Sequence, residues 1–171
     1  VVVMEPVVVT ATRFEGDAAL VPASIQLVDA NTIAATAASS IADILGDVGV
    51  LMRSYTGNPA QSQIDMRGYG ESGNLNVLVL VDGRRINAPD MSGINWLNMP
   101  LAGVDRVEVL RGSQSALYGN NAGGGVIKIT TKVPDAPGGS VIAGAGSWNT
   151  SVLRAAAWTP ISDSVRISSE I

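Results

Sequence analysis

The stretch that decides the fold runs from Val104 to Lys132 and reads VDRVEVLRGSQSALYGNNAGGGVIKITTK. Its first seven residues are rich in valine and are predicted to form a strand. Gly112 then permits a turn that a Cβ atom would crowd. Gln114–Tyr118 is long enough for one or two helical turns, with Ser113 as the candidate N-cap. The following glycines release the chain into a second strand, Val126–Thr131, and the short turns predict that the two strands are neighbours.

Composition excludes several classes of function. The 171 residues include no histidine and no cysteine, so disulfides, Ser-His-Asp triads and metal sites built on these side chains cannot form. The 11 basic residues are scattered singly and the net charge is −4, which argues against nucleic-acid binding. No run of about 18 apolar residues is present, so no membrane helix is expected. We expect no cofactor, no metal and no enzymatic activity.

The residues before the first long loop predict a strand, two helices and a short strand: Ser24–Asp29, Asn31–Ala38, Ser40–Leu45 and Val50–Ser54. Asp29 or Asn31 is expected to cap the first helix. Ser39 or Ser40 is expected to cap the second helix, whose apolar residues recur at helical spacing. This order fits many α+β domains.

Two stretches in the middle of the chain predict further strands. Gln63–Arg67 alternates in polarity, which places Asp65 on a polar face. Val77–Val81 is a run of apolar residues, which predicts a strand covered on both faces. Asp82-Gly83 is typical of a two-residue type I′ turn, and Arg84–Asn87 is the expected return strand.

One glycine pattern suggests a nucleotide site, which we reject. Residues 68–73, GYGESG, match the dinucleotide-binding pattern G-x-G-x-x-G. That pattern requires a helix next and an acidic residue about 20 positions further on. Here Asn74 is expected to lead directly into an apolar strand, and Asp82 comes too early.

Three motifs together resemble the plug domain of TonB-dependent outer-membrane receptors. They are RVEVLRG with the following ALYG and GGVI within residues 106–127, MRG at 66–68, and VLVLVDGRRIN at 77–87. One departure is Ser113, where the family usually has proline. The resemblance implies an α+β fold: a small mixed β-sheet plug with short helices and long apical loops.

The resemblance also implies a division of the chain into four parts. These are a TonB-box-like segment at 1–13, the plug at 14–132, a linker at 133–139, and the first antiparallel strands of a truncated transmembrane β-barrel at 140–171. Trp148 and Trp158 are ten positions apart, which suits the length of a tilted membrane strand. Three strands cannot close a barrel, so we expect a fragment consisting of a plug and the first barrel strands.

The function implied by the resemblance is energy-coupled import of a scarce ligand across the outer membrane of a Gram-negative bacterium. A ferric siderophore is the expected ligand, with cobalamin, haem or a glycan as the other classes. The plug would lie inside the barrel lumen with its N-terminus in the periplasm. The expected partners are TonB, the receptor's own C-terminal barrel, the ligand, and the membrane through the barrel. The alternative is a free-standing soluble plug-like protein that binds a ligand or TonB without a barrel.

The N-terminal segment resembles a TonB box, which pairs as an added strand with the periplasmic protein TonB. The residues concerned are Glu5, Pro6, Val7, Val8, Val9, Thr10 and Ala11. By composition alone, the same residues also fit an edge strand or a frayed terminus.

Four residues in the long loops are candidates for ligand contact, by analogy with the family's apical loops. They are Tyr55, Tyr69, Asp90 and Trp96. The alternative for Trp96 is that it anchors its loop onto the sheet.

Three charged residues are candidates for a latch between plug and barrel: Arg67, Glu108 and Arg111. In the family, the arginines that match Arg67 and Arg111 pair with glutamates of the barrel wall. Loss of both arginines is then expected to leave an isolated plug nearly unaffected. The alternative is that all three are solvated surface charges.

Overall fold

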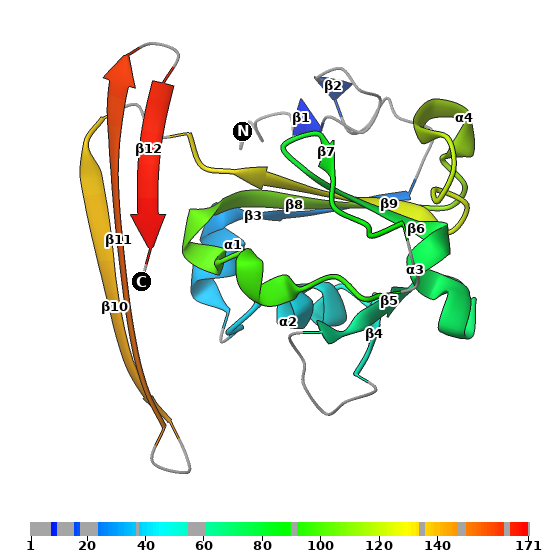
Figure 1. Ribbon diagram of the computed structural model, residues 1–171, viewed down its shortest axis with the longest axis horizontal. Coiled ribbons are helices and arrows are strands. Elements are labelled where there is room, and N and C mark those ends of the chain that lie inside the picture. The colour runs from blue at the N-terminus through cyan, green and yellow to red at the C-terminus, as the bar shows by residue number, and fades with distance from the viewer. Residues whose placement is uncertain are drawn as a thin grey trace, which may run out of the picture. The chain divides into compact units, whose positions relative to one another are not determined.

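The computed structural model describes residues 8–9, 16–17, 24–36, 38–54, 61–89, 92–133, 136–146, 150–162 and 165–170. The chain divides into two compact units, Val1–Thr131 and Lys132–Ile171. Figure 1 shows a sheet with short helices in the first unit and long strands in the second.

A five-stranded mixed sheet forms the centre of the first unit. Its strands, in spatial order, are β3 (Ser24–Asp29), β8 (Val104–Arg111), β9 (Gly125–Thr131), β6 (Val77–Val81) and β7 (Arg84–Arg85). Neighbouring strands are antiparallel except β9 and β6, which are parallel. This mixed sheet with short helices confirms the predicted α+β class.

The stretch that connects β8 to β9 folds in the predicted order of strand, helix and strand. Gly112 has a φ of 102°, as the turn after β8 requires. Helix α4 (Ser115–Tyr118) begins after Gln114, which makes no side-chain capping bond. The prediction that Ser113 caps this helix is therefore wrong. The Gln114 amide instead donates to the carbonyl of Ala122 at 2.8 Å, so the loop is closed by its own backbone.

Helices α1 (Ala30–Ala35) and α2 (Ile41–Asp47) lie on one side of the sheet (Figure 1). The Asp29 carboxylate accepts a hydrogen bond from a first-turn amide of α1 at 2.7 Å. Ser40 caps α2, and Asp43 completes a capping box by accepting from the Ser40 amide. The structure thus selects Asp29 and Ser40 from the two pairs of predicted caps.

The remaining elements of the first unit are short. They are β1 (Val8–Val9), β2 (Gly16–Asp17), β4 (Leu51–Arg53), β5 (Gln63–Asp65), η3 (Gly70–Ser72), α3 (Gly73–Asn76), η4 (Trp96–Asn98) and η5 (Leu101–Gly103). Two antiparallel pairs form, β1 with β2 and β4 with β5.

The expectation that Asn74 leads directly into a strand is wrong, because Asn74 lies in α3. A Cβ atom on Gly73 would lie 2.4 Å from the Ile64 carbonyl oxygen, so the glycine allows this turn to pack directly on β5. A single turn that enters β6 at once does not supply the helix of a dinucleotide site.

Two hydrophobic clusters cover the two faces of the main sheet. The larger one contains residues of α1 and α2 with Val107 and Val109 of β8, and the smaller one contains Leu110 of β8. Strand β6 contributes Val77 and Val79 to the larger cluster and Leu78 and Leu80 to the smaller one. The prediction that β6 is covered on both faces is therefore confirmed.

The turn after β6 has the predicted geometry, since Asp82 and Gly83 have φ values of 48° and 80°. The return strand β7 stops before Asn87, which the sequence predicts to be its last residue. Beyond β7, the Asn87 side chain makes hydrogen bonds to the backbone of β6. Its Oδ1 accepts from the Val79 amide at 2.7 Å, and its Nδ2 donates to the Val77 carbonyl at 2.8 Å.

The second unit is a three-stranded antiparallel sheet of β10 (Gly138–Gly146), β11 (Thr150–Ser162) and β12 (Val165–Glu170). The sequence favours a tight turn at 160–163, but β11 continues through Pro160 to Ser162. A register irregularity there accommodates the proline. Val141 and Leu153 are 73% and 74% exposed, so this sheet has apolar side chains that are accessible to solvent. Trp148 lies outside the described residues. Among the helices that the structure describes, none is both long and apolar enough to cross a membrane.

Candidate functional site

The candidate TonB-binding segment is described at two residues, Val8 and Val9, which form β1. This strand pairs with β2 so that Val8 lies opposite Asp17. An extended backbone is the conformation that strand addition requires. The other predicted residues of the segment lie outside the described residues: Glu5, Pro6, Val7, Thr10 and Ala11.

Tyr69 is the candidate for ligand contact that the described surface presents, being 41% exposed. The Asp65 carboxylate holds its loop, because it accepts from the amides of Tyr69 at 2.9 Å and Gly70 at 2.8 Å. The sequence places Asp65 on a polar strand face. In the structure Asp65 is only 2% exposed, since two loop amides satisfy its oxygens in place of water.

The Tyr69 ring lies over the glycine run that precedes β9. A Cβ atom on Gly124 would lie 3.2 Å from Cε2 of Tyr69, and one on Gly123 would lie 3.9 Å from its hydroxyl oxygen. The absence of side chains at 123 and 124 therefore leaves room for the ring. The glycine run, which the sequence shows only as a turn signal, also supports a candidate ligand residue.

Trp96 is buried, with an exposed fraction of 1%. Its indole Nε1–H donates to the carbonyl oxygen of Ser62 at 2.9 Å. A side chain in this position fixes its loop and presents no surface to a ligand, so the structure supports the anchoring alternative. The two other candidates, Tyr55 and Asp90, lie outside the described residues.

Arg111 of the predicted latch makes contacts within the first unit. Its Nη2 donates to the carbonyl oxygen of Val48, the C-cap residue of α2, and to Gln26 Oε1 at 3.2 Å. A guanidinium at a helix C-terminus satisfies a carbonyl that has no partner within the helix, and it interacts favourably with the helix dipole. The expectation that an isolated plug is indifferent to Arg111 therefore needs correction.

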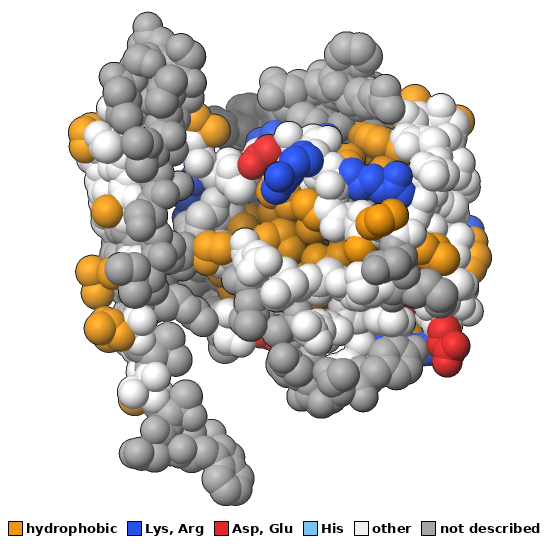
Figure 2. All heavy atoms as spheres, in the orientation of Figure 1, with side chains coloured by type: hydrophobic (Ala, Val, Ile, Leu, Met, Phe, Trp, Pro, Cys, Tyr) orange, Lys and Arg blue, Asp and Glu red, His pale blue; other side chains and the backbone are white. Residues whose placement is uncertain are grey.

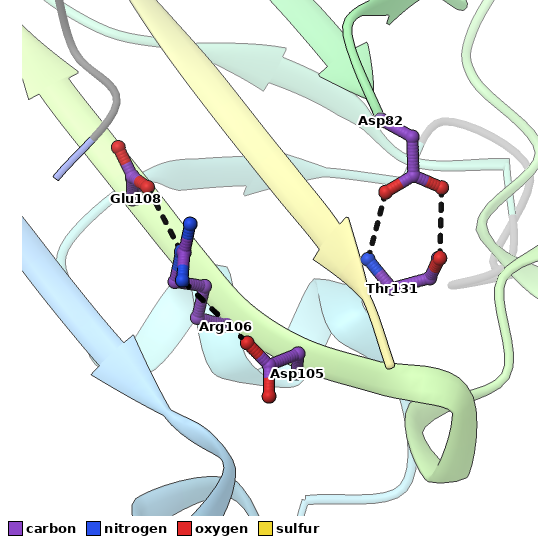
Figure 3. Close-up of polar contacts among 5 residues, drawn as sticks. All are labelled: Asp82, Asp105, Arg106, Glu108 and Thr131. Carbon is purple, nitrogen blue, oxygen red and sulfur yellow. Dashed lines mark hydrogen bonds and ion pairs between the residues drawn. The ribbon is translucent and has the colours of Figure 1, made fainter. Parts of the chain in front are cut away.

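Glu108 of the predicted latch is an internal residue with an exposed fraction of 0%. Its Oε1 lies 3.2 Å from Arg106 Nε (Figure 3), and Lys128 of β9 lies opposite it. Burial lowers the pKa of Lys128 below its ordinary value, and the Glu108 carboxylate partly offsets this effect. The structure thus assigns Glu108 to a charge cluster inside the plug. Because side chains alternate along a strand, Glu108 and Arg111 face opposite sides of the sheet.

Arg67 is the member of the predicted latch that remains on the surface. It is exposed and has a φ of 81°, which is uncommon for a residue with a side chain. A Cβ atom on Gly112 would lie 3.4 Å from Arg67 Nη2, so the two Arg-Gly motifs meet at this glycine. The structure therefore brings Arg67 close to the turn that follows Arg111 but separates both from Glu108.

A further basic surface lies outside the predicted groups. Figure 2 shows Lys and Arg side chains over β7 with hydrophobic side chains gathered beside them. Strand β7 consists of Arg84 and Arg85, both exposed, and Arg85 Nη1 donates to Asn120 Oδ1 at 3.3 Å. Val81 and Ile86, on either side of β7, are partly buried against the larger hydrophobic cluster.

A profile of the TonB-dependent Receptor Plug Domain family matches residues 17–126, which include the main sheet up to the start of β9. This chain belongs to the TonB-dependent receptor plug domain family. The predicted family is therefore confirmed, together with the plug fold.

Relatives of this plug domain include transporters and receptors of much greater length. The vitamin B12 transporter BtuB of Vibrio vulnificus is 39% identical over 145 residues, which are 84% of this chain and 23% of the transporter. The ferric yersiniabactin uptake receptor FyuA of Yersinia pestis has a TM-score of 0.65 at 30% identity, covering 82% of this chain and 22% of the receptor. The ferripyoverdine receptor of the Pseudomonas aeruginosa outer membrane has a TM-score of 0.72, covering 96% of this chain and 22% of that one; at 24% identity it shows the fold alone. The chain spans about a quarter of the length of these relatives.

Sequence reasoning missed Asp65 as the residue whose side chain holds the loop that carries Tyr69. The available signal was its spacing, because an aspartate four or five residues before loop amides can accept from them. Likewise, Asn87 was predicted only as the last residue of the return strand, whereas its side chain completes the pairing of β6. In both cases a short polar side chain replaces backbone pairing.

The plug domain offers a direct comparison of the arginines of its two Arg-Gly motifs. Replacing Arg111 by alanine is expected to lower the free energy of unfolding of this chain by about 1–2 kcal/mol, because the C-terminus of α2 loses a charged donor. Arg67→Ala removes no hydrogen bond that the structure shows and is expected to change it by less than about 0.5 kcal/mol. Urea melts followed by circular dichroism measure both. Equal effects would mean that the Val48 contact adds nothing to stability.

Proposed function

We propose that this plug belongs to an outer-membrane transporter and gates the energy-coupled import of a scarce small ligand. The observation that carries the proposal is the plug-family match over residues 17–126. The names of the relatives support it, because they are uptake receptors and a vitamin transporter. In this proposal the plug lies in the lumen of the receptor's own C-terminal barrel, with its N-terminus in the periplasm.

The strands of the second unit support this assignment over a free-standing soluble plug-like protein. We propose that residues 140–171 belong to the first strands of the barrel and that the linker follows Lys132. The start of β10 at Gly138 makes this linker shorter than the predicted 133–139. The length of the parent open reading frame and the intact mass of the native protein test the proposal. A mature protein of this length without a barrel would favour the soluble alternative.

For the ligand we propose a ferric siderophore, as the sequence predicts, with cobalamin as the second candidate. The similarity to the ferric yersiniabactin receptor supports the first, and the 39% identity to a vitamin B12 transporter favours the second. A receptor-deletion strain that carries the full gene, supplied with single ferric siderophores, haem, cobalamin or glycans, would decide. Restored growth or uptake on one class identifies it. Failure on every class would contradict the proposed import function.

The proposed contact with TonB rests on strand addition at Glu5–Ala11, of which β1 is the described part. Val8→Pro removes one amide donor and fixes φ, so it is expected to abolish uptake in the full receptor. Binding of the ligand to whole cells should be unchanged, because Val8 is not among the candidate ligand residues. Ligand uptake and cell-surface binding, measured in parallel, check this.

A conservative replacement provides the control for that experiment. Val8→Ile keeps the amide donor and the β-branched side chain, so uptake should persist. Undiminished transport by the proline variant would remove residues 5–11 from the proposed TonB contact.

A further inference from the structure

Strand β5 and the two residues before it hold the bases of three loops at once. The loops are named by their sequence ranges, 54–62, 66–73 and 88–100, of which the structure describes residues 54, 61–62, 66–73, 88–89 and 92–100. The candidate ligand residue Tyr69 lies in the second range. Strand β5 is only Gln63–Asp65, and it pairs with β4 outside the main sheet. Its contacts with these loops come from side chains and close backbone packing.

The first contact joins the base of loop 54–62 to loop 88–100. Trp96, buried in η4, donates its indole N–H to the Ser62 carbonyl at 2.9 Å. In the same loop, a Cβ atom on Gly93 would lie 3.2 Å from the Gln61 carbonyl oxygen. Two points of loop 88–100 therefore rest on the two residues that lead into β5.

The second contact joins the middle of β5 to α3, where loop 66–73 returns to the main sheet. The Ile64 amide donates to Asn74 Oδ1 at 2.9 Å, and both residues are buried. Gly73 packs so closely that a Cβ atom there would lie 2.4 Å from the Ile64 carbonyl oxygen and 3.0 Å from Asp65 Cβ. A displacement of β5 therefore moves α3 as well.

The third contact joins the end of β5 to loop 66–73, through the Asp65 carboxylate. It accepts from the amides of Tyr69 and Gly70, and it is almost fully buried. Charge-assisted bonds of this kind are among the stronger hydrogen bonds in proteins. The loop that they hold has positive φ values at Arg67, Gly68 and Gly70. Glycine adopts positive φ without steric cost, so the strained residue of the loop that the carboxylate holds is Arg67.

Strand β5 and helix α3, which packs on it, also contain polar atoms that are not satisfied. Gln63 Oε1 and Asn74 Nδ2 are buried and have no hydrogen-bond partner within the part of the chain that the structure describes. Buried polar atoms of this kind carry a desolvation cost, which raises the free energy of the arrangement seen here. The difference in free energy between this arrangement and an alternative one is therefore smaller. A segment with strained backbone and unsatisfied atoms is suited to having two arrangements.

We propose that β5 couples the described parts of the three loops, with Asp65, Asn74 and Trp96 as the positioning residues. A change in the position of one loop is relayed through β5 to the other two and to Arg67 at the surface. The relevance of this coupling to ligand gating rests on the proposed import function. The coupling itself is a property of this chain and is measurable without a ligand.

The first test compares two chemically identical substitutions, Asp65→Asn and Asp82→Asn. Each carboxylate accepts two hydrogen bonds, from Tyr69 and Gly70 in one case and twice from Thr131 in the other (Figure 3). The readout is hydrogen exchange of the Trp96 indole N–H. Loss of one accepting oxygen in Asp65→Asn is expected to accelerate this exchange about fivefold to tenfold, whereas Asp82→Asn should leave it within about twofold.

Amide exchange in β8 and β9 shows whether each variant keeps its main sheet. If Asp65→Asn affects only the Tyr69 and Gly70 amides while the Trp96 indole exchanges as before, the coupling is overturned. An equal acceleration in both variants would also overturn it, because the effect would then be global.

The reciprocal variant keeps the proposal testable if Asp65→Asn does not fold. Trp96→Phe removes the indole donor but retains an aromatic ring. It is expected to accelerate exchange at Ile64, Tyr69 and Gly70 by about fivefold, although none of these residues contacts Trp96 through a bond that the structure shows. Changes confined to residues 92–99 would overturn the coupling. Neither experiment uses a ligand, so a failed import assay and a failed coupling assay are separate results.

Discussion

Trp96→Ala is expected to lower the free energy of unfolding of the first unit by about 3–5 kcal/mol. The side chain is 1% exposed, so its removal leaves a cavity as well as lost apolar burial. It also leaves the Ser62 carbonyl without the indole donor. Since a domain of this kind is stable by about 5–15 kcal/mol, the loss is a large fraction of the total. Urea melts followed by far-ultraviolet circular dichroism measure it.

Trp158→Ala is the matched control for that experiment. Trp158 lies in β11 of the second unit and is only partly buried, so its loss should leave the unfolding of the first unit nearly unchanged. If Trp96→Ala proved as mild as Trp158→Ala, the anchoring role would be refuted. Trp96 would then return as a candidate for ligand contact.

Gly73→Ala is expected to lower the free energy of unfolding by about 1–3 kcal/mol, occasionally more. The added methyl would lie 2.4 Å from the Ile64 carbonyl oxygen and 3.0 Å from Asp65 Cβ, so the backbone of β5 or α3 has to move. Because β5 supports three loops, we expect chemical-shift changes to extend to Trp96. Denaturant melts and two-dimensional amide spectra of the same sample measure both effects.

Gly46→Ala makes the same chemical change with the opposite expected sign. Apart from its chain neighbours and the backbone of its own helix, α2, no atom lies within 4 Å of the Cβ position of Gly46. Alanine there reduces the conformational freedom of the unfolded chain and is expected to stabilise by about 0.4–1 kcal/mol. Destabilisation by both alanines would show that the close contact at Gly73 does not determine the effect.

The contacts of the residues in the candidate site could not be predicted from the sequence. The Arg-Gly motifs were visible in the sequence, but the role of each arginine was not. Arg111 contacts Val48, which is 63 positions away in the chain, so no local pattern indicates that contact. Arg67 remains at the surface and keeps its predicted role in the latch as a proposal.

The sequence by itself determined the local elements of this protein. Asp82-Gly83 produced the predicted turn because few residue pairs adopt positive φ twice in succession. Ser40 and Asp43 produced a capping box, and the apolar run at 77–81 produced a strand covered on both faces. The turn and the capping box depend on residues within a few positions of one another, and the apolar run indicates by its composition that the strand is covered.

Only the tertiary structure decided which polar residues are buried and what they hold. Asp65 and Glu108 occupy polar positions of alternating strands, yet both are buried. Loop amides satisfy the first, while Arg106 of the same strand and Lys128 of the next strand neutralise the second. Burial of a charge depends on which partners the assembled fold brings to it, because an unpaired buried carboxylate is too costly to persist. Alternation along a single strand carries no information about those partners.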